Sequence, residues 1–456
     1  MNKIARRAWI TLVLVLVLIG GFSWFGVQFF LESENWVISS GSPHVYNGNN
    51  IGCGVAIDKD GILLLDMTDG REYTEDDALR KATVHWVGDR YGNINAPALA
   101  AHAADLAGFD MVNGIYDYGD NAGVAQMTLS AQAQTAALEA MGSYSGTVAV
   151  YNYKTGQLLC AVTTPTYDPD DAPDLSQDQD GKYEGIYLNR FTQSSYIPGS
   201  IFKVVTLAAA LETIPDIQQQ TFTCTGALEF GIDKITCEHT HGQQDLQSAF
   251  RNSCNCAFAQ IALQVGDEAM DRYVKKFGIT ESISFDGITT AQGNYEVLGA
   301  ADVNIGWSGI GQYNDQINPC AYLTFVGAIA NDGQQVFPYL VEKVTVGNTQ
   351  TYRAKTQTGD RLLSEETVQL MREYLRSNVQ QMYGDSQFGG LNVCAKTGTA
   401  EVGGDKKPNA MLVGFVTDEE YPLAFIVCAE DAGYGSSVCM PIASKVLAAC
   451  KATMDG

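Results

Sequence analysis

The segment 198–212 constrains this chain more than any other stretch. A Pro-Gly pair predicts a turn, and the Ala- and Leu-rich run after it predicts a buried helix that ends at Pro215. Ser200 and Lys203 lie three residues apart at the start of this run, so both side chains project from the same side of the first turn. A serine hydroxyl becomes a strong nucleophile when a base takes its proton, so the pair has a direct chemical use.

The surroundings of Lys203 favour this use. Its neighbours Phe202, Val204 and Val205 are apolar, and it sits at the positive end of the predicted helix. Burial and the helix dipole both disfavour the charged ammonium, so the pKa of Lys203 is expected to fall towards the range of a usable base. For this motif alone, the alternative is an ordinary helix with a serine N-cap and a lysine in its first turn.

Two further motifs favour the catalytic interpretation. Ser253-Cys-Asn255 follows the Ser-x-x-Lys pair, and Lys396-Thr-Gly-Thr399 follows later, between apolar strand-like runs. A β-turn is the alternative for Lys-Thr-Gly, and the flanking strands disfavour it. Each motif alone is weak, whereas Ser-x-x-Lys, Ser-x-Asn and Lys-Thr-Gly in this order form a known set of serine acyl-transfer enzymes.

Length and charge limit the classes of function. The 456 residues, 46% of them hydrophobic, are enough for two or three domains. The formal net charge of −24 disfavours nucleic-acid binding, because phosphate would be repelled.

The N-terminus predicts a membrane anchor. Lys3, Arg6 and Arg7 precede the uncharged apolar run 8–30, which as a helix would span roughly 35 Å, enough for a bilayer core of about 30 Å. The basic flank predicts that residues 1–7 stay cytoplasmic and that the chain after the anchor, from about residue 31, lies outside the cell. A cleaved signal peptide is the alternative, although the bulky residues near Trp24 make a poor cleavage site.

Eleven cysteines do not form a dense disulfide framework. Cys224 and Cys237 bracket a Gly-rich segment and are the one pair that looks linked. His239 and His241 follow directly, which raises a metal site as the alternative. The spacing matches no familiar zinc motif, so we expect a disulfide or two free thiols. Cys254 and Cys256, which flank Asn255, are interpreted as buried packing residues, as are most of the others.

The pattern of elements predicts an α+β fold. Residues 31–50 read as a polar linker, and the stretch up to residue 123 as a small α+β domain with a helix at 74–81 and a strand at 82–87. A strand, a helix at 131–141 and a hairpin at 146–163 come next. A mostly helical middle and two closing strands with a helix complete the chain. We expect N- and C-terminal strands to share one antiparallel sheet with helices on both faces, beside an all-helical insert.

From residue 124 to 448, and in its anchor, the chain resembles the class B penicillin-binding proteins, the monofunctional peptidoglycan D,D-transpeptidases. Besides the three motifs, four blocks carry the resemblance: Lys154-Thr-Gly156, Pro165-Thr-Tyr-Asp-Pro169, Ala249–Phe258 and Gly309-Ile-Gly-Gln312. The resemblance implies the penicillin-binding and serine β-lactamase-like fold. It divides the chain into a tail (1–7), an anchor (8–30), a pedestal (31–123) and a transpeptidase domain (124–456), without C-terminal accessory domains.

The resemblance also implies roles for the motif residues. Ser200 would be the nucleophile, Lys203 its base and Ser253 a proton relay held by Asn255 and Lys396. Backbone N–H groups of Ser200 and Thr399 would form the oxyanion hole. Thr397 and Thr399 would bind the substrate carboxylate, and Gly398 would allow close approach of the bound backbone.

The substrate implied is the D-Ala-D-Ala end of a peptidoglycan stem peptide. Ser200 would take the acyl group and expel D-alanine, and the amine of a neighbouring stem would complete the cross-link in the cell wall, during growth that sets cell shape or during cell division. A β-lactam would acylate the same serine. The resemblance implies no metal or organic cofactor, and a polytopic glycan polymerase as a partner.

One part of the family pattern is altered. Members carry an Arg-Gly-x-Ile-x-Asp-Arg-Asn-Gly signature, whereas the counterpart here, Asn50–Gly61, lacks both arginines. Other functions also stay open: a D,D-carboxypeptidase, a serine β-lactamase, or a non-catalytic structural member of a cell-wall synthesis complex. A membrane β-lactam sensor is disfavoured, because one predicted span and a short tail leave no cytoplasmic effector.

Overall fold

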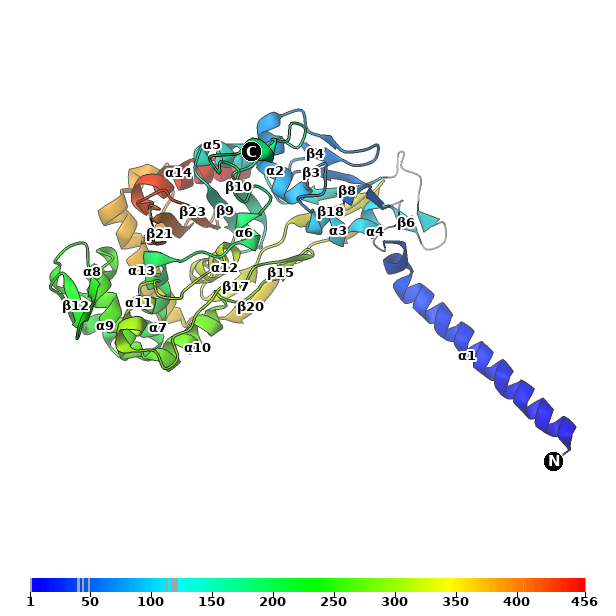
Figure 1. Ribbon diagram of the computed structural model, residues 1–456, viewed down its shortest axis with the longest axis horizontal. Coiled ribbons are helices and arrows are strands. Elements are labelled where there is room, and N and C mark those ends of the chain that lie inside the picture. Colours follow the sequence, from blue (N-terminus) through cyan, green and yellow to red (C-terminus); the bar gives the residue numbers. More distant parts are fainter. Residues whose placement is uncertain are drawn as a thin grey trace.

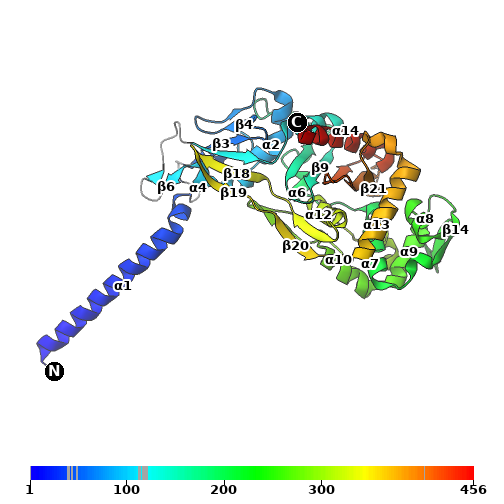
Figure 2. The ribbon, with the colours of Figure 1, turned by 180° about the vertical axis from the view of Figure 1, so that it is seen from behind.

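One helix projects from the rest of the molecule. The computed structural model describes residues 2–38, 42, 45–47, 50–110, 114–115, 122–404 and 406–455. Helix α1 (Lys3–Val37) extends away from the body beside α4 (Ala103–Leu106), at the far end from the helical region (Figures 1 and 2). Among the described residues, it alone is long and apolar enough to cross a membrane, and it contains the predicted span 8–30. The predicted linker 31–50 is helical up to Val37, and part of it lies outside the described residues.

A five-stranded antiparallel sheet forms the centre of the body. Its order is β10-β9-β23-β22-β21, which confirms that N- and C-terminal strands share one sheet. Every residue of β9, β10 and β23 is buried, since helices cover both faces. The strand bounds are β9 Gly146–Asn152, β10 Leu158–Thr164, β21 Val393–Ala400, β22 Asn409–Val416 and β23 Leu423–Ala429.

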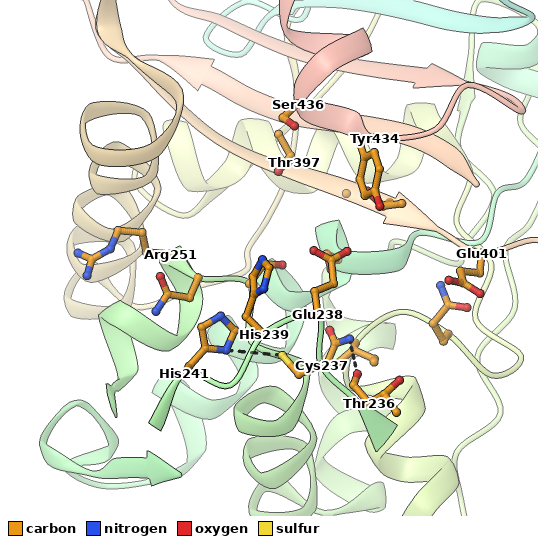
Figure 3. A pocket seen from close by; sticks show the side chains of 18 of the residues that line it. Thr236, Cys237, Glu238, His239, His241, Arg251, Thr397, Glu401, Tyr434 and Ser436 are labelled. Atoms are coloured by element: carbon orange, nitrogen blue, oxygen red, sulfur yellow. Dashed lines mark hydrogen bonds between the residues drawn. The ribbon is translucent and has the colours of Figure 1, made fainter. Parts of the chain in front are cut away.

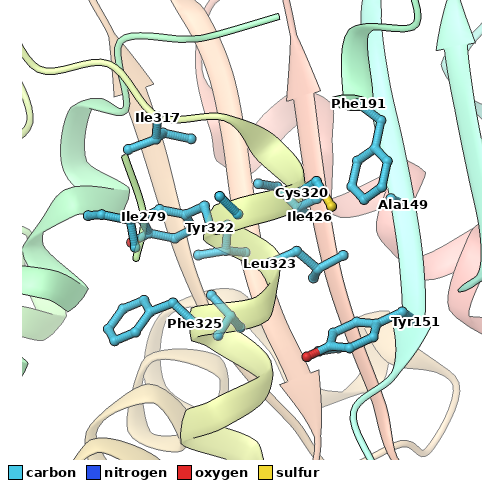
Figure 4. Packing of buried hydrophobic residues seen from close by; sticks show 14 of the residues in the cluster. Ala149, Tyr151, Phe191, Ile279, Ile317, Cys320, Tyr322, Leu323, Phe325 and Ile426 are labelled. Carbon is cyan, nitrogen blue, oxygen red and sulfur yellow. The ribbon is translucent and has the colours of Figure 1, made fainter. Parts of the chain in front are cut away.

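The two faces pack against different helices, because successive side chains of a strand point in opposite directions. Val148 and Val150 pack with α5 (Ala131–Met141) and α14 (Gly435–Asp455). Ala149 and Tyr151 face the other way, towards α12 (Pro319–Ala330), whose twelve residues are all buried. Figure 4 shows Tyr322, Leu323 and Phe325 of α12 packed across the sheet. The central helix α12 therefore fixes the sheet against the helical region.

A second sheet combines three distant segments. Its order is β19-β18-β8-β3-β4-β5, with β8 parallel to β3 and antiparallel to β18. Residues before and after position 124 therefore share one sheet. The bounds are β3 Val55–Ile57, β4 Leu63–Asp66, β5 Glu72–Tyr73, β8 Gly123–Met127, β18 Val341–Val346 and β19 Thr349–Arg353.

The strand predicted at residues 82–87 is wrong, because this segment belongs to α2 (Asp77–Val87). The side chain of Asp76 caps the helix by accepting hydrogen bonds from the backbone N–H groups of Ala78 and Leu79. Residues 82–87 are all buried, and the indole of Trp86 donates to Ala161 O over 2.6 Å. Tertiary burial thus overrides the strand preference of Thr, Val and Trp.

The helical region surrounds α7 (Lys203–Thr213), which contacts α9, α10 and α13. Two short helices, α8 (Leu246–Arg251) and α9 (Asn255–Val265), follow one another here and are separated by a turn. The other bounds here are α10 Asp267–Phe277, α11 Asp302–Ser308, α13 Glu365–Asn378, β11 Thr221–Cys224, β12 Ala227–Phe230, β13 Asp233–Thr236 and β14 Gly242–Asp245.

Shorter elements complete the chain: β1 Tyr46–Asn47, β2 Asn50–Ile51, α3 Pro97–Ala101, β6 Phe109–Asp110, β7 Gly114–Ile115, α6 Arg190–Gln193, β15 Ser284–Phe285, β16 Ile288–Thr289, β17 Gln334–Phe337 and β20 Gln357–Arg361.

Candidate active site

Ser200 and Lys203 lie at the start of the buried helix α7. Residues Gly199–Phe202 form a 3-10 turn that runs directly into α7. Residues three apart lie on one side of such a turn, and Lys203 Nζ donates to Ser200 Oγ over 2.9 Å. The structure therefore brings the first motif together as a hydrogen-bonded pair.

The second motif occupies the turn between α8 and α9. Ser253 has a positive φ of 50°, unusual for a residue with a side chain. This conformation directs its carbonyl to Lys203, whose Nζ donates to Ser253 O over 2.7 Å and to Asn255 Oδ1 over 2.7 Å. The Nζ also lies 3.2 Å from Ser253 Oγ. Lys203 thus links the two motifs.

The third motif lies on edge strand β21. Lys396 Nζ donates to Ser253 Oγ over 3.0 Å and to Thr397 O over 2.9 Å. Ser253 Oγ is consequently within hydrogen-bond distance of both lysines. The structure assembles Ser200, Lys203, Ser253, Asn255 and Lys396 into one network.

Burial alters the electrostatics of both lysines. The side chain of Lys203 is fully buried, and that of Lys396 is 1% exposed. Loss of solvation lowers the pKa of Lys203 to about 8. The pKa of Lys396 is well below its ordinary range, first through burial and then through repulsion by Lys203. A neutral amine at hydrogen-bond distance from a serine hydroxyl is placed to accept its proton, which is how serine nucleophiles are generated.

A cavity of about 790 Å³ lies over this network (Figure 3). Ser200, Ser253 and Asn255 line it from the helical side, and residues 397–399 of β21 line it from the sheet side. The predicted substrate-binding residues Thr397, Gly398 and Thr399 therefore face the same space as the predicted nucleophile. The cavity is open to solvent between the two, which leaves room for an extended peptide beside β21.

Tyr383 is a site residue that the sequence motifs do not include. It ends a π-helical turn after α13, and its hydroxyl accepts the Thr397 N–H over 3.1 Å and lies 3.0 Å from Thr397 Oγ1. Glu238, His239 and Tyr434 also line the cavity without having been predicted as substrate contacts. These residues belong to none of the three sequence motifs, and only the folded structure shows that they line the cavity.

The absence of a side chain at Gly199 allows the first and third motifs to lie close together. Gly199 has φ +53°, and a Cβ there would lie 2.4 Å from the carbonyl oxygen of Thr399. The positive φ alone costs an alanine about 1–2 kcal/mol. We expect Gly199→Ala to push β21 away from Ser200 and to slow acylation by a penicillin about tenfold or more.

Gly389→Ala is the matched control, because Gly389 has φ +59° and a Cβ added there would meet no atom within 4 Å. It carries the same backbone strain without the crowding. Rates of penicillin labelling and thermal unfolding should be compared for both variants. Equal labelling rates would contradict the close-approach role of Gly199.

The disulfide expected between Cys224 and Cys237 is absent. All eleven cysteines lie in the described part of the chain and all are free thiols. Cys224 Sγ donates instead to His239 O over 3.5 Å, and Cys237 Sγ lies near His241 Nδ1. The alternative of two free thiols is the one that the structure shows.

Comparison with known proteins agrees with this geometry. The family model of the penicillin-binding protein transpeptidase domain matches residues 146–448. Peptidoglycan D,D-transpeptidase PbpA of Mycolicibacterium smegmatis is 28% identical over 351 residues, 71% of this chain and 71% of that protein. Stage V sporulation protein D of Bacillus subtilis is 29% identical over 325 residues, 66% of this chain and 48% of that protein.

A solved structure shows the same fold. Penicillin-binding protein A of Mycobacterium tuberculosis, as a ceftriaxone acyl-enzyme complex, matches with a TM-score of 0.70 and 22% identity, over 87% of this chain and 98% of that chain. The family match covers most of the chain. The protein therefore belongs to the penicillin-binding protein transpeptidases, within the class of monofunctional D,D-transpeptidases that its motifs resemble.

Proposed function

We propose that this protein is a peptidoglycan D,D-transpeptidase that cross-links stem peptides through an acyl-enzyme on Ser200. The observation that carries the proposal is the 2.9 Å hydrogen bond between Ser200 Oγ and the buried amine of Lys203, at the wall of an open cavity. A hydroxyl beside a lysine of lowered pKa is an activated nucleophile.

The first half-reaction forms an ester. Lys203 takes the hydroxyl proton while Ser200 Oγ attacks the carbonyl carbon of the D-Ala-D-Ala peptide bond. The bond to the terminal residue then breaks, and Ser253 passes a proton to the leaving amine. Two contacts support this relay, since Ser253 Oγ lies 3.2 Å from Lys203 Nζ and 3.0 Å from Lys396 Nζ.

The developing oxyanion needs donors close to Ser200. We assign this role to the backbone N–H groups of Ser200 and Thr399. The support is the close approach of the two segments, because the carbonyl of Thr399 lies against Gly199, directly before Ser200. Thr397 and Thr399 are assigned to the substrate carboxylate, because both line the cavity on the sheet side.

In the second half-reaction, the amine of a neighbouring stem attacks the ester and frees Ser200. A β-lactam would acylate the same serine but leave slowly. The homologous penicillin-binding protein A has been captured as a ceftriaxone acyl-enzyme, which supports β-lactam binding by this site. Water as the acceptor would make the protein a D,D-carboxypeptidase or a β-lactamase instead.

For placement in the cell, we propose a single-pass anchor at residues 8–30, with residues 1–7 cytoplasmic and the catalytic domain outside. Helix α1 and the basic flank at Arg6 and Arg7 support it. We further propose 31–123 as a pedestal and 124–456 as the transpeptidase domain. Because strands β3 and β8 pair across the boundary, the two parts should move together. A polytopic glycan polymerase is the proposed partner.

Persistence of a penicillin label tests the reaction class. The full chain in detergent is labelled with a fluorescent penicillin, the excess is removed, and the adduct is followed over time. A transpeptidase should keep the label for many minutes, because only water is available as acceptor. Loss within seconds to minutes would identify a β-lactamase, and no labelling of folded protein would leave only a structural role.

A further inference from the structure

Four potential metal ligands gather beside the active site. They come from three separate places: Cys224 at the end of β11, Cys237 and His241 between β13 and β14, and Cys254 at the start of α9. Their sulfur and nitrogen atoms all lie within 4.8 Å of one another. Cys224 and Cys254 are buried, and Cys237 and His241 are half-buried. Figure 3 shows His241 and Cys237 pointing towards each other.

The distances within this cluster fit a tetrahedral ion. Cys237 Sγ lies 3.9 Å from Cys254 Sγ and 3.6 Å from His241 Nδ1. Zinc binds sulfur at about 2.3 Å and histidine nitrogen at about 2.0–2.1 Å, so a tetrahedron has sulfur–sulfur edges of about 3.8 Å and sulfur–nitrogen edges of about 3.6 Å. What distinguishes the cluster from an ordinary thiol contact is that four ligand atoms, three sulfurs and one imidazole nitrogen, all lie within 4.8 Å of one another.

A backbone N–H group points at one of the sulfurs. The N–H of Ala257 donates to Cys254 Sγ over 3.4 Å, so this sulfur caps α9. Thiolate is the form that binds metal, and N–H groups around the sulfurs are the support that such ligands require.

We propose that Cys224, Cys237, His241 and Cys254 bind one structural Zn²⁺ ion. Three thiolates and one imidazole are a ligand set of closed zinc sites, whereas Mg²⁺ and Ca²⁺ take oxygen ligands. The site ties the segment between β11 and β14 to the beginning of α9. The site takes up the alternative of a metal site that the neighbouring histidines raised.

The zinc site would hold the second catalytic motif in place. Cys254 lies between Ser253 and Asn255, and Asn255 Nδ2 donates to Thr236 O over 2.9 Å, next to Cys237. Both residues of this motif that contact Lys203 therefore depend on the same anchored segment. This consequence rests on the proposed function, whereas metal binding itself does not.

Metal content is the primary test. The full chain, purified in detergent under reducing conditions and without chelators, should contain about one zinc per chain by atomic emission. Cobalt substituted for zinc should give the visible absorption of a tetrahedral thiolate site. Cys237→Ser and His241→Ala should lose most of the metal. His241→Cys should retain it, because a fourth thiolate still completes a tetrahedron.

His239→Ala is the matched control for metal binding. It removes an imidazole from the same segment, whose ring lies 6.1 Å from that of His241 and outside the ligand set. Its zinc content should equal that of the parent. Reduced parent protein that takes up neither Zn²⁺ nor Co²⁺ would overturn the proposal. So would an unchanged cobalt spectrum in Cys237→Ser, or a disulfide between two of the three cysteines in the purified protein.

Acylation is a separate readout. Removing zinc with a chelator should slow penicillin labelling of the parent roughly tenfold and should be reversed by added zinc. A zinc-containing protein that never reacts with penicillin would contradict the proposed function and leave the metal site standing.

Discussion

Ser200→Ala is expected to abolish covalent labelling by a fluorescent penicillin. The change removes the one atom, Oγ, that Lys203 Nζ contacts at 2.9 Å and that would form the ester. No other group can replace it in the same position, so the loss of activity should be on the order of 10⁶-fold, as in other serine enzymes without their nucleophile. Gel fluorescence after labelling, with mass spectrometry of the adduct, measures the effect.

Ser195→Ala is the matched control for this loss. Ser195 lies five residues earlier, and its exposed hydroxyl donates to Gln316 outside the cavity. Its labelling should equal that of the parent, and both variants should unfold at about the parent's temperature. Labelling of Ser200→Ala at an undiminished rate would show that another residue is the nucleophile and would refute the proposed mechanism.

Residue patterns predicted those parts of the fold in which local preference and burial agree. The hairpin at 146–163 and the helix at 131–141 have boundaries within a residue or two of those expected. The strand predicted at 82–87 is wrong because the β-branched and aromatic residues of this segment are buried within the last turns of α2. That packing depends on contacts with residues far along the chain, such as Ala161, and a short stretch of sequence does not show such contacts.

The first part of the motif network was predictable because the contact between Ser200 and Lys203 is local. Ser200 and Lys203 share one turn. The order of the three motifs along the chain then predicted that the other two motifs would lie beside this pair. The positive φ of Ser253 was not predictable, and it lies in the turn that separates α8 from α9. Tyr383 was also missed, because its partner Thr397 lies on a different element and no motif includes a tyrosine at that position.

The cysteine cluster shows the limit of spacing as evidence. Cys224, Cys237 and His241 lie within one segment, but the fourth ligand, Cys254, belongs to the Ser-x-Asn motif. It was interpreted as a buried packing residue because the sequence shows no exposed, reactive surroundings, and it is buried in the structure. The folding of β11–β14 over the start of α9 brings the four together, and this contact is visible only in three dimensions.

Lys203→Met is expected to slow acylation by about 10²–10⁴-fold, the usual contribution of a general base. Methionine has a similar length and no basic nitrogen, so Ser200 would keep its proton. Lys203 is fully buried, and a neutral side chain of similar volume suits that position, although Asn255 Oδ1 loses a donor. Stopped-flow labelling with a chromogenic β-lactam measures the rate, and a thermal melt shows whether the variant is folded.

The dependence of the acylation rate on pH tests whether Lys203 acts as the base or only as a structural cation. Burial lowers its pKa to about 8, and the neutral amine is the active form. The acylation rate of the parent should therefore rise as pH increases through about 8 and then level off, and this rise should disappear in Lys203→Met. Lys275→Met, which removes an exposed lysine, should retain the parent's profile. If Lys203→Met kept the rise near pH 8, the base would have to be another group, and Lys396, which reaches Ser253 Oγ at 3.0 Å, would be the next to test.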